Sequence, residues 1–155
     1  MKRIKPTLDG VDAARADAFA RWRILALRAS SRRRDYRPRL SLVACDDINR
    51  AQHLPEDIAS WEPPTRTAHP IDAGLAVEIT ARLLHQVDGG RVTAVWTRRG
   101  PNEATDSDIG WWSAVRHGAA IAEVPTPSLL VITRWGWHCL PYGTGRTWQR
   151  LRPTG

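Results

Sequence analysis

Three short apolar runs alternate with two segments of helical periodicity, and this alternation limits the possible folds more than any other feature of the chain. The runs, at residues 40–45, 91–97 and 128–133, have the length and the β-branched content of buried strands. The segments at 71–87 and 106–122 are predicted to be helices, and the first repeats apolar residues at helical spacing. Strands interleaved with helices predict a single mixed sheet flanked by helices, an α+β or α/β fold.

Weaker signals complete the predicted order of elements. Residues 10–30 are rich in Ala, Leu and Arg and predict an N-terminal helix. The segment DDIN at 46–49 predicts a turn, and a second, weak strand is expected near 64–68. Alternation after the third apolar run predicts a hairpin partner, which would place Trp135 and Trp137 on one face.

Length and composition restrict the class of protein. The 155 residues, 42% of them hydrophobic, fit one globular domain with a buried core. No stretch approaches the roughly 18 apolar residues of a membrane span, and no apolar run follows the basic N-terminus as in a secretory signal. Cys45 and Cys139 lie outside any paired-cysteine motif. We therefore expect a soluble cytoplasmic protein with two reduced thiols and no membrane partner.

Positive charge is concentrated in the first quarter of the chain. Residues 1–39 hold twelve Lys and Arg against four Asp and Glu, a balance of +8. The balance is −5 for residues 40–90 and +4 for residues 91–155. All but two of the 23 basic residues are arginine, which is the better fork for phosphate and stacks better on flat rings. This distribution favours an anionic partner, either nucleic acid or an acidic protein.

The charge distribution also predicts how the chain is organised. Residues 30–39, SSRRRDYRPR, are polar and basic, and Pro38 disfavours helix at the residue before it. We expect a basic N-terminal helix and exposed arm at 1–39, a core at 40–142 and a basic C-terminal tail at 143–155.

Eight tryptophans stand beside a single phenylalanine. One interpretation is a core and its rim that use Trp in place of Phe. The other is an aromatic platform interleaved with arginine, on which bases stack while the guanidinium groups hold phosphates. The candidate nucleic-acid contacts are Arg32, Arg33, Arg34, Arg37 and Arg39 for phosphate, and Trp135, Trp137, Arg146 and Trp148 for stacking and clamping.

Motifs for catalysis are weak. The chain has no nucleophile-elbow, phosphate-loop or dinucleotide-binding glycine motif, and its five histidines lack metal-ligand spacing. Thr105, Asp106 and Asp108 precede a predicted helix, where such residues commonly cap. An enzymatic alternative remains, in which Asp72, Asp106 and Asp108 hold a divalent metal for phosphodiester or phosphoryl chemistry.

Four segments in the central part of the chain occur in the order of a known family. In that family a strand and turn have the pattern L-x-L-D-x-x-N, and LSLVACDDIN at 40–49 is similar to it. The family then has H-P-R-E before a helix, and here HPID, which ends at Asp72, stands in that place. An apolar strand then runs into Trp96-Thr97-Arg98, and Thr105-x-x-Asp108 heads the next helix in the manner of S-x-x-D. Over residues 40–142 the chain resembles a JAB/MPN domain, in particular its RadC-like branch.

The resemblance implies a metal-free version of that domain. In the family, two histidines and the aspartate bind zinc, the glutamate handles a proton of the metal-bound water, and the serine helps to stabilise the oxyanion. Here Trp96 and Arg98 stand in the places of the histidines, Asp72 in that of the glutamate and Thr105 in that of the serine, whereas Asp108 is retained. Tryptophan does not bind zinc, and arginine stays protonated and repels it.

The leading hypothesis is a non-enzymatic, nucleic-acid-associated protein of low sequence specificity, with a metal-free JAB-like core and no cofactor. One alternative is a protein–protein adaptor that uses a Trp-rich surface and grips an acidic partner with its arm. The other alternative is the unrecognised carboxylate- and metal-dependent hydrolase described above.

Overall fold

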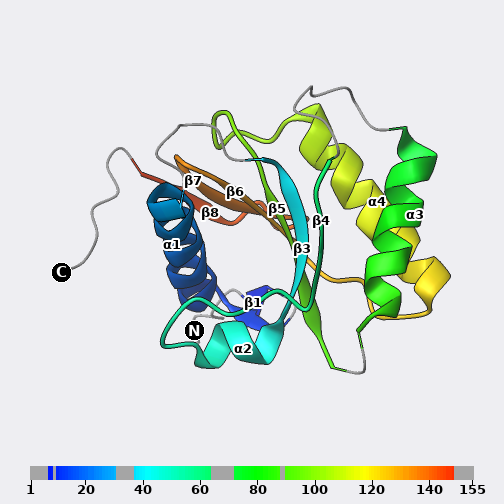
Figure 1. Ribbon diagram of the computed structural model, residues 1–155, viewed down its shortest axis with the longest axis horizontal. Helices are drawn as coiled ribbons and strands as arrows, with labels where there is room; N and C mark the ends of the chain where they lie inside the picture. Colours follow the sequence, from blue (N-terminus) through cyan, green and yellow to red (C-terminus); the bar gives the residue numbers. More distant parts are fainter. Residues whose placement is uncertain (1–6, 9, 31–36, 64–71, 88–89, 149–155) are drawn as a thin grey trace, which may run out of the picture.

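A six-stranded sheet between two layers of helices forms the body of the computed structural model (Figure 1). The structure describes residues 7–8, 10–30, 37–63, 72–87 and 90–148. The sheet strands are β3 (Arg39–Ala44), β4 (Ala59–Trp61), β5 (Val92–Thr97), β6 (Leu129–Thr133), β7 (Gly136–Leu140) and β8 (Gly145–Thr147). The helices are α1 (Ala13–Ser30), α2 (Cys45–Arg50), α3 (Ala73–His85) and α4 (Asp106–Ala122), and β1 (Thr7–Leu8) pairs with β2 (Val11–Asp12) in a separate small hairpin.

The sheet is mixed, with the strand order β4-β3-β5-β6-β7-β8. Strands β5 and β6 are parallel and are connected through α4, whereas the other neighbouring strands are antiparallel. Helices α1 and α2 lie on one face, and α3 and α4 lie on the other (Figure 1). The expected fold class, a single mixed α+β sheet flanked by helices, is confirmed.

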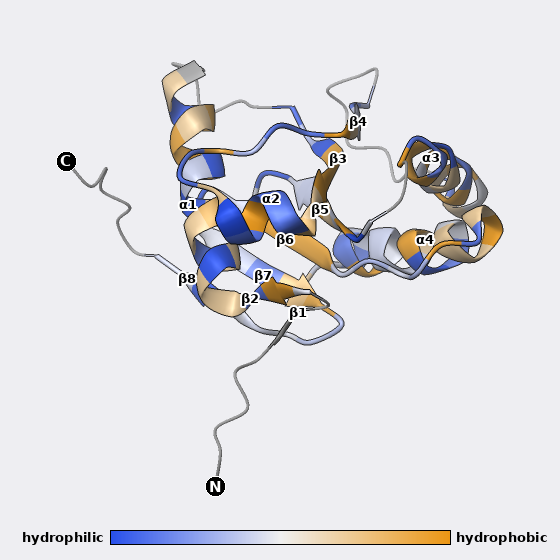
Figure 2. Ribbon diagram, turned by 90° about the horizontal axis from the view of Figure 1, so that it is seen from below, coloured by the Kyte–Doolittle hydropathy of each residue, from blue (hydrophilic) through white to orange (hydrophobic). Residues whose placement is uncertain are grey.

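Each face of the sheet has its own apolar core, and strand alternation divides the side chains between them. On β6, Leu130 and Ile132 belong to the core under α1, while Leu129 and Val131 belong to the core under α3 and α4. Because both faces of β6 are covered, the strand reads as one continuous apolar run rather than an alternating one. Figure 2 shows these hydrophobic strands enclosed between the helices.

Helix α1 shares a core with the sheet. Phe19 and Ile24 are fully buried and cluster with Val43 of β3 and Leu130 of β6. This helix, which comes from the most basic part of the sequence, therefore packs on the segment that sequence analysis places in the core. In the described part of the chain, no helix is long and apolar enough to cross a membrane.

Most predicted elements have bounds close to those expected, and α4 has the expected bounds of 106–122. The exception is 46–49, which is the interior of α2 and not a turn. Asp46 and Asp47 stand in the first turn of this helix, where carboxylates are favoured, and Cys45 and Ile48 bury its inner face. The weak strand expected at 64–68 lies outside the described residues, and β4 occupies 59–61.

Candidate functional site

A buried arginine directly after β5 organises the polar residues at one end of the sheet. The Arg98 side chain donates from Nε to Asp108 Oδ1 at 2.6 Å and from Nη2 to Asp108 Oδ2 at 2.7 Å. Its Nη1 donates to the carbonyl oxygens of Arg99 and Pro101, and its Nη2 donates to that of Glu103, each at 2.9 Å. These contacts use all five N–H groups of the guanidinium, so one side chain fixes the loop between β5 and α4.

Asp108, at the start of α4, is the carboxylate partner of Arg98, and the Asp108 side chain is fully buried. It forms a capping box with Thr105: Asp108 N donates to Thr105 Oγ1 at 3.2 Å, and Thr105 N donates to Asp108 Oδ2 at 3.0 Å. Nε2 of His138, on β7, lies 3.4 Å from Asp108 Oδ2. Burial raises the pKa of Asp108, but His138, the hydrogen bonds and charge of Arg98, and the Thr105 amide outweigh burial and hold the pKa well below its ordinary value.

Asn102 connects the same loop to the far strands of the sheet. Its Nδ2 donates to Trp137 O at 3.1 Å, and to Arg146 O and Thr147 Oγ1 at 3.2 Å each. Its Oδ1 lies 3.0 Å from Nδ1 of His138. The loop, the first turn of α4 and the β7–β8 hairpin are therefore joined by one polar network, which we call the Arg98 network (Arg98, Asn102, Thr105, Asp108 and His138).

The structure gathers three of the five positions that the JAB/MPN resemblance singles out. Arg98, Thr105 and Asp108 are in direct contact in the Arg98 network. Trp96 is buried against Trp111 of α4, with ring centroids 5.1 Å apart. Asp72 is exposed at the N-cap of α3 and makes no side-chain capping bond.

These residues do not fit a zinc ion. Arg98 occupies both carboxylate oxygens of Asp108 and places a permanent positive charge beside them. In the described ranges, no three His, Cys, Asp or Glu side chains are grouped as a metal site. Asp106 is exposed in the first turn of α4, so the carboxylate cluster of the enzymatic alternative has no counterpart at this helix end.

All eight tryptophans lie within the described residues, and most of them build the two cores. Trp96 and Trp111 are buried under α3 and α4, Trp137 and Trp148 are buried on the α1 side, and Trp22, Trp61 and Trp112 are half-buried. Trp135 is exposed, at 43%. The first interpretation of the tryptophan content, a core and rim built with Trp, therefore describes seven of the eight residues.

The stacking platform expected from the sequence needs a correction at two positions. Thr133 pairs with Gly136, so Arg134 and Trp135 form a two-residue turn, and strand alternation resumes only at Gly136. Trp135 therefore does not share a strand face with Trp137. The Trp137 ring is buried, with Nε1 donating to Asp17 of α1 at 2.8 Å, and the Trp148 ring is buried beside it in the α1-side core. Neither ring is exposed for stacking on a ligand.

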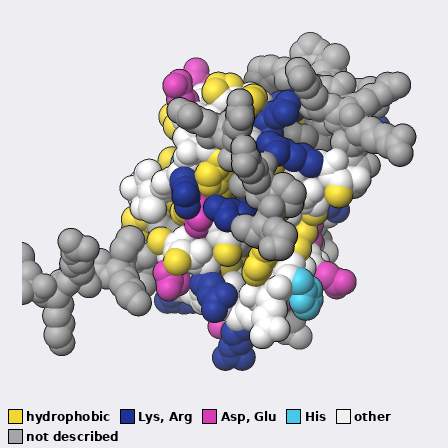
Figure 3. All heavy atoms as spheres, turned by 90° about the vertical axis from the view of Figure 1, so that its left-hand side faces the viewer, with side chains coloured by type: hydrophobic (Ala, Val, Ile, Leu, Met, Phe, Trp, Pro, Cys, Tyr) yellow, Lys and Arg dark blue, Asp and Glu magenta, His cyan; other side chains and the backbone are white. Residues whose placement is uncertain are grey.

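One arginine lies in the exposed turn, a second contacts it, and a third lies on the neighbouring strand. Arg28, in the last turn of α1, donates from Nη2 to the carbonyl oxygen of Arg134 at 3.4 Å. The Arg134 guanidinium lies 4.9 Å from the centroid of the Trp135 ring. Arg146 of β8 is exposed, with Nη1 3.3 Å from Asp17 Oδ2. We call Arg28, Arg134, Trp135 and Arg146 the turn surface; Figure 3 shows Lys and Arg side chains recurring across this side of the molecule.

The arginines expected to form the arm have different surroundings. Arg32, Arg33 and Arg34 lie outside the described residues, and Arg37 is exposed. Arg39 lies among acidic groups, 3.6 Å from Asp57 and 3.7 Å from Glu62. Its side chain is therefore already engaged by carboxylates.

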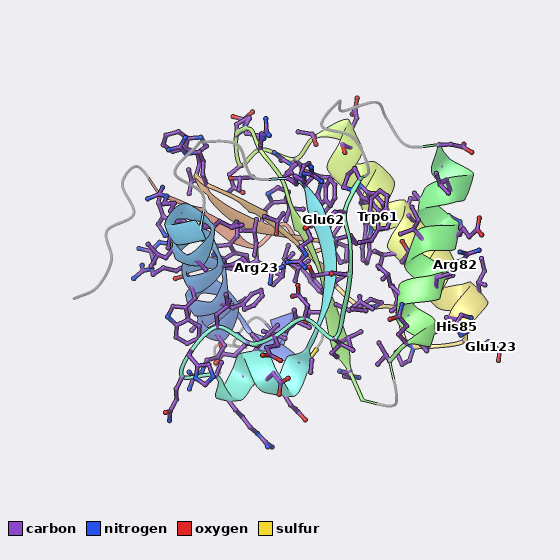
Figure 4. All side chains as sticks on the ribbon, viewed as in Figure 1. Arg23, Trp61, Glu62, Arg82, His85 and Glu123 are labelled. Atoms are coloured by element: carbon purple, nitrogen blue, oxygen red, sulfur yellow. The ribbon has the colours of Figure 1, made fainter. Side chains whose placement is uncertain are left out.

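A second buried arginine adjoins that acidic group. Arg23 of α1 donates to Asp57 Oδ1 and to Ser41 Oγ, each at 2.8 Å. Figure 4 shows Arg23 on the α1 side of the sheet and Trp61 on the α4 side. The ion pair with Asp57 ties α1 to the segment that precedes β4, and the hydrogen bond to Ser41 ties it to β3.

The sequence motifs singled out Arg98, Thr105 and Asp108, but not Asn102 and His138, which complete the network. Asn102 and His138 were missed because they are separated by 36 positions and belong to no spacing motif. The one available signal was Arg98 itself, a charged residue at the end of an apolar strand, and a buried charge requires a partner.

The fold and these contacts define an α+β protein with a single mixed sheet, a buried arginine–carboxylate network at one end and an arginine-lined turn with an exposed indole. No family model, no curated protein and no solved structure matches the chain. The likeness to JAB/MPN domains therefore rests on the sequence pattern alone.

Proposed function

We propose that this protein binds nucleic acid through its phosphates, with weak sequence preference and without catalysis. The observation that carries the proposal is the turn surface, where Arg134 lies over the exposed Trp135 ring, Arg28 contacts the same turn, and Arg146 lies on the neighbouring strand β8. Guanidinium groups bind phosphate oxygens, and an exposed indole adds a face for a base. Contacts to phosphate carry no sequence information, so binding should be largely independent of sequence.

The most basic segment of the sequence continues from the same end of α1. Helix α1 ends at Ser30, two residues after Arg28, and Arg32, Arg33 and Arg34 follow directly in the sequence. These three residues belong to the proposed interface, together with Arg37 and the turn surface. Arg39 and Arg146 contribute less to it, because Asp57 and Glu62 lie beside Arg39, and Asp17 lies 3.3 Å from Arg146.

The buried polar residues support a binding role over a catalytic one. Both oxygens of Asp108 are held by Arg98, so this carboxylate is not free to bind a metal ion or to exchange a proton with a substrate. In our proposal the core is a metal-free, JAB-like scaffold in which an ion pair stands where the family has its metal.

We place the protein in the cytoplasm. Cys45 and Cys139 are both buried and are not joined by a disulfide, as is usual for proteins of a reducing compartment.

Fluorescence anisotropy with mixed-sequence DNA and RNA oligonucleotides over a salt series tests the proposal. The double variant R32Q/R33Q removes two positive charges from the proposed interface. The variant R82Q/R116Q removes two charges from exposed positions on α3 and α4, on the opposite side of the molecule. We expect the first variant to lower the slope of log affinity against log salt by about two for duplex DNA, and the second to leave it unchanged.

Two results would contradict the proposal. One is the absence of salt-dependent binding by the wild-type protein at low ionic strength. The other is an equal loss of affinity in both double variants, which would show attraction by net charge without a defined surface.

A further inference from the structure

We propose that Trp135 is a stacking site for one unpaired base, so that the preferred ligand is single-stranded nucleic acid. This inference rests on the proposed function and specifies its ligand class. The observation behind it is an aromatic ring that is 43% exposed at the tip of a turn whose backbone is held from three sides.

Hydrogen bonds from three separate parts of the chain anchor the turn. The Trp135 amide donates to Oγ1 of Thr133 at 3.1 Å, and the Trp135 carbonyl accepts from the Trp148 amide at 2.7 Å. Arg28 of α1 donates to the neighbouring carbonyl of Arg134 at 3.4 Å. The ring is therefore presented on a fixed support, so the turn loses little conformational entropy when a ligand binds.

The turn itself does not require an indole. Two-residue hairpin turns favour Gly, Asn and Asp for conformational reasons, and tryptophan offers none of these advantages. The other seven tryptophans are buried or half-buried. Other large apolar side chains of the described residues are equally exposed, so exposure by itself does not mark a ligand site. Trp135 is distinguished by being an aromatic ring with an arginine guanidinium over it, the pair of groups that holds a base and its phosphate.

The neighbours of the ring suit a base attached to a phosphate backbone. The guanidinium of Arg134, 4.9 Å from the ring centroid, makes a cation–π contact with the indole. Arg28 contacts the Arg134 carbonyl and adds positive charge beside the turn, whereas the charge of Arg146 is partly balanced by Asp17. A base stacked on Trp135 would thus have guanidinium groups within reach of its flanking phosphates.

Duplex ligands cannot use this ring in the same way. Bases in a double helix are already stacked on one another, and exposing one costs a few kcal/mol. A single strand can place a base on an aromatic side chain without that cost, and such stacking tolerates any base. The site therefore discriminates strandedness and not sequence.

The test compares three variants on a single-stranded oligonucleotide and on the duplex of the same sequence. W135A removes the ring, W135F keeps a smaller aromatic face, and Y142A removes a comparably exposed aromatic side chain (49%) from the β7–β8 turn. We expect W135A to weaken single-strand binding about 5- to 150-fold, W135F to recover most of it, and Y142A to change it less than about twofold. Duplex affinity should stay within about twofold in all three variants.

The outcomes separate this inference from the proposed function. If W135A binds single strands as the wild type does while binding still falls with salt, the stacking site is wrong and the proposed function stands. If W135A weakens single-strand and duplex binding equally, Trp135 supports the surface without stacking, and the inference is again wrong. If the wild type binds neither ligand at low salt, both proposals fail. Matching circular dichroism and thermal unfolding of W135A and wild type would show that the comparison concerns folded protein.

Discussion

Arginine has opposite roles in the Arg98 network and in the turn surface. Arg98 is 7% exposed, and its N–H groups point at acceptors within the chain. Arg28 and Arg146 are exposed, and each has a contact to the chain at 3.3–3.4 Å. The difference shows that a formal charge of +7 does not measure what is available to a ligand. A buried arginine is part of the fold, whereas an exposed one can bind a partner.

Removing the buried guanidinium should have the largest effect on stability. R98M leaves the Asp108 carboxylate buried without its counter-charge, and we expect the free energy of unfolding to fall by about 3–5 kcal/mol. Urea denaturation would measure it, with R116M, on the exposed side of α4, as the control. In the double variant R98M/D108N the loss should be smaller than the sum of the two single losses. A loss below about 1 kcal/mol for R98M would remove the contrast between the two regions.

Acid should weaken the same network. The pKa of Asp108 is lowered in the folded protein, so the unfolded chain takes up the proton first as the pH falls below about 4. The stability that Asp108 contributes is therefore present at neutral pH and is lost as the pH falls through and below that value. Denaturation measured between pH 6 and pH 2 should show the difference in the free energy of unfolding between the wild type and D108N shrinking as the pH falls. The exposed D46N variant should keep the acid response of the wild type, and a pH-independent gap between wild type and D108N would contradict this assignment.

Replacing Asn102 should have an intermediate effect on stability. Its amide joins the loop after β5 to β7 and β8 through several hydrogen bonds, and N102A would leave the carbonyl oxygens of Trp137 and Arg146 without this donor. We expect a loss of about 1–3 kcal/mol in the free energy of unfolding. The exposed Q52A variant serves as the control. An unchanged midpoint in thermal or urea unfolding would mean that the two regions are joined by other contacts.

The smallest effect on stability is expected at the turn surface. R134A removes a half-exposed guanidinium, and the free energy of unfolding should change by no more than about 0.5 kcal/mol. The same variant should weaken binding to single-stranded oligonucleotides, measured by anisotropy at low salt. A large loss of stability without a change in affinity would reverse the roles given to the two regions.

Helices and strands that carry a strong local signal, such as a capping box or a continuous apolar run, could be predicted from the sequence. The bounds of α4 follow from Thr105 and Asp108, which close a capping box, and β6 follows from an apolar run between breakers. Helix α2 was mistaken for a turn because aspartate favours both turns and the first turn of a helix, so DDIN does not distinguish them.

The site was less accessible to sequence reasoning because its contacts join distant positions. Arg98 was interpreted as a lost metal ligand, but its partnership with Asp108 depends on how α4 returns over β5. Trp137 was assigned to a surface because alternation was counted from Trp135, and the two-residue turn shifted the count by placing Trp135 off the strand. In both cases the type of residue was informative, but the direction in which its side chain points could be determined only from the three-dimensional fold.

The way Arg98 holds its loop also has an evolutionary consequence. Apart from the Asp108 carboxylate, its acceptors are backbone carbonyls, at Arg99, Pro101 and Glu103, and every amino acid supplies the same carbonyl. The contacts of Arg98 therefore place no requirement on which side chain stands at these three positions. Positions 98 and 108 have no such freedom, because Arg98 and Asp108 balance each other's buried charge, and we expect homologous chains to change them together or not at all.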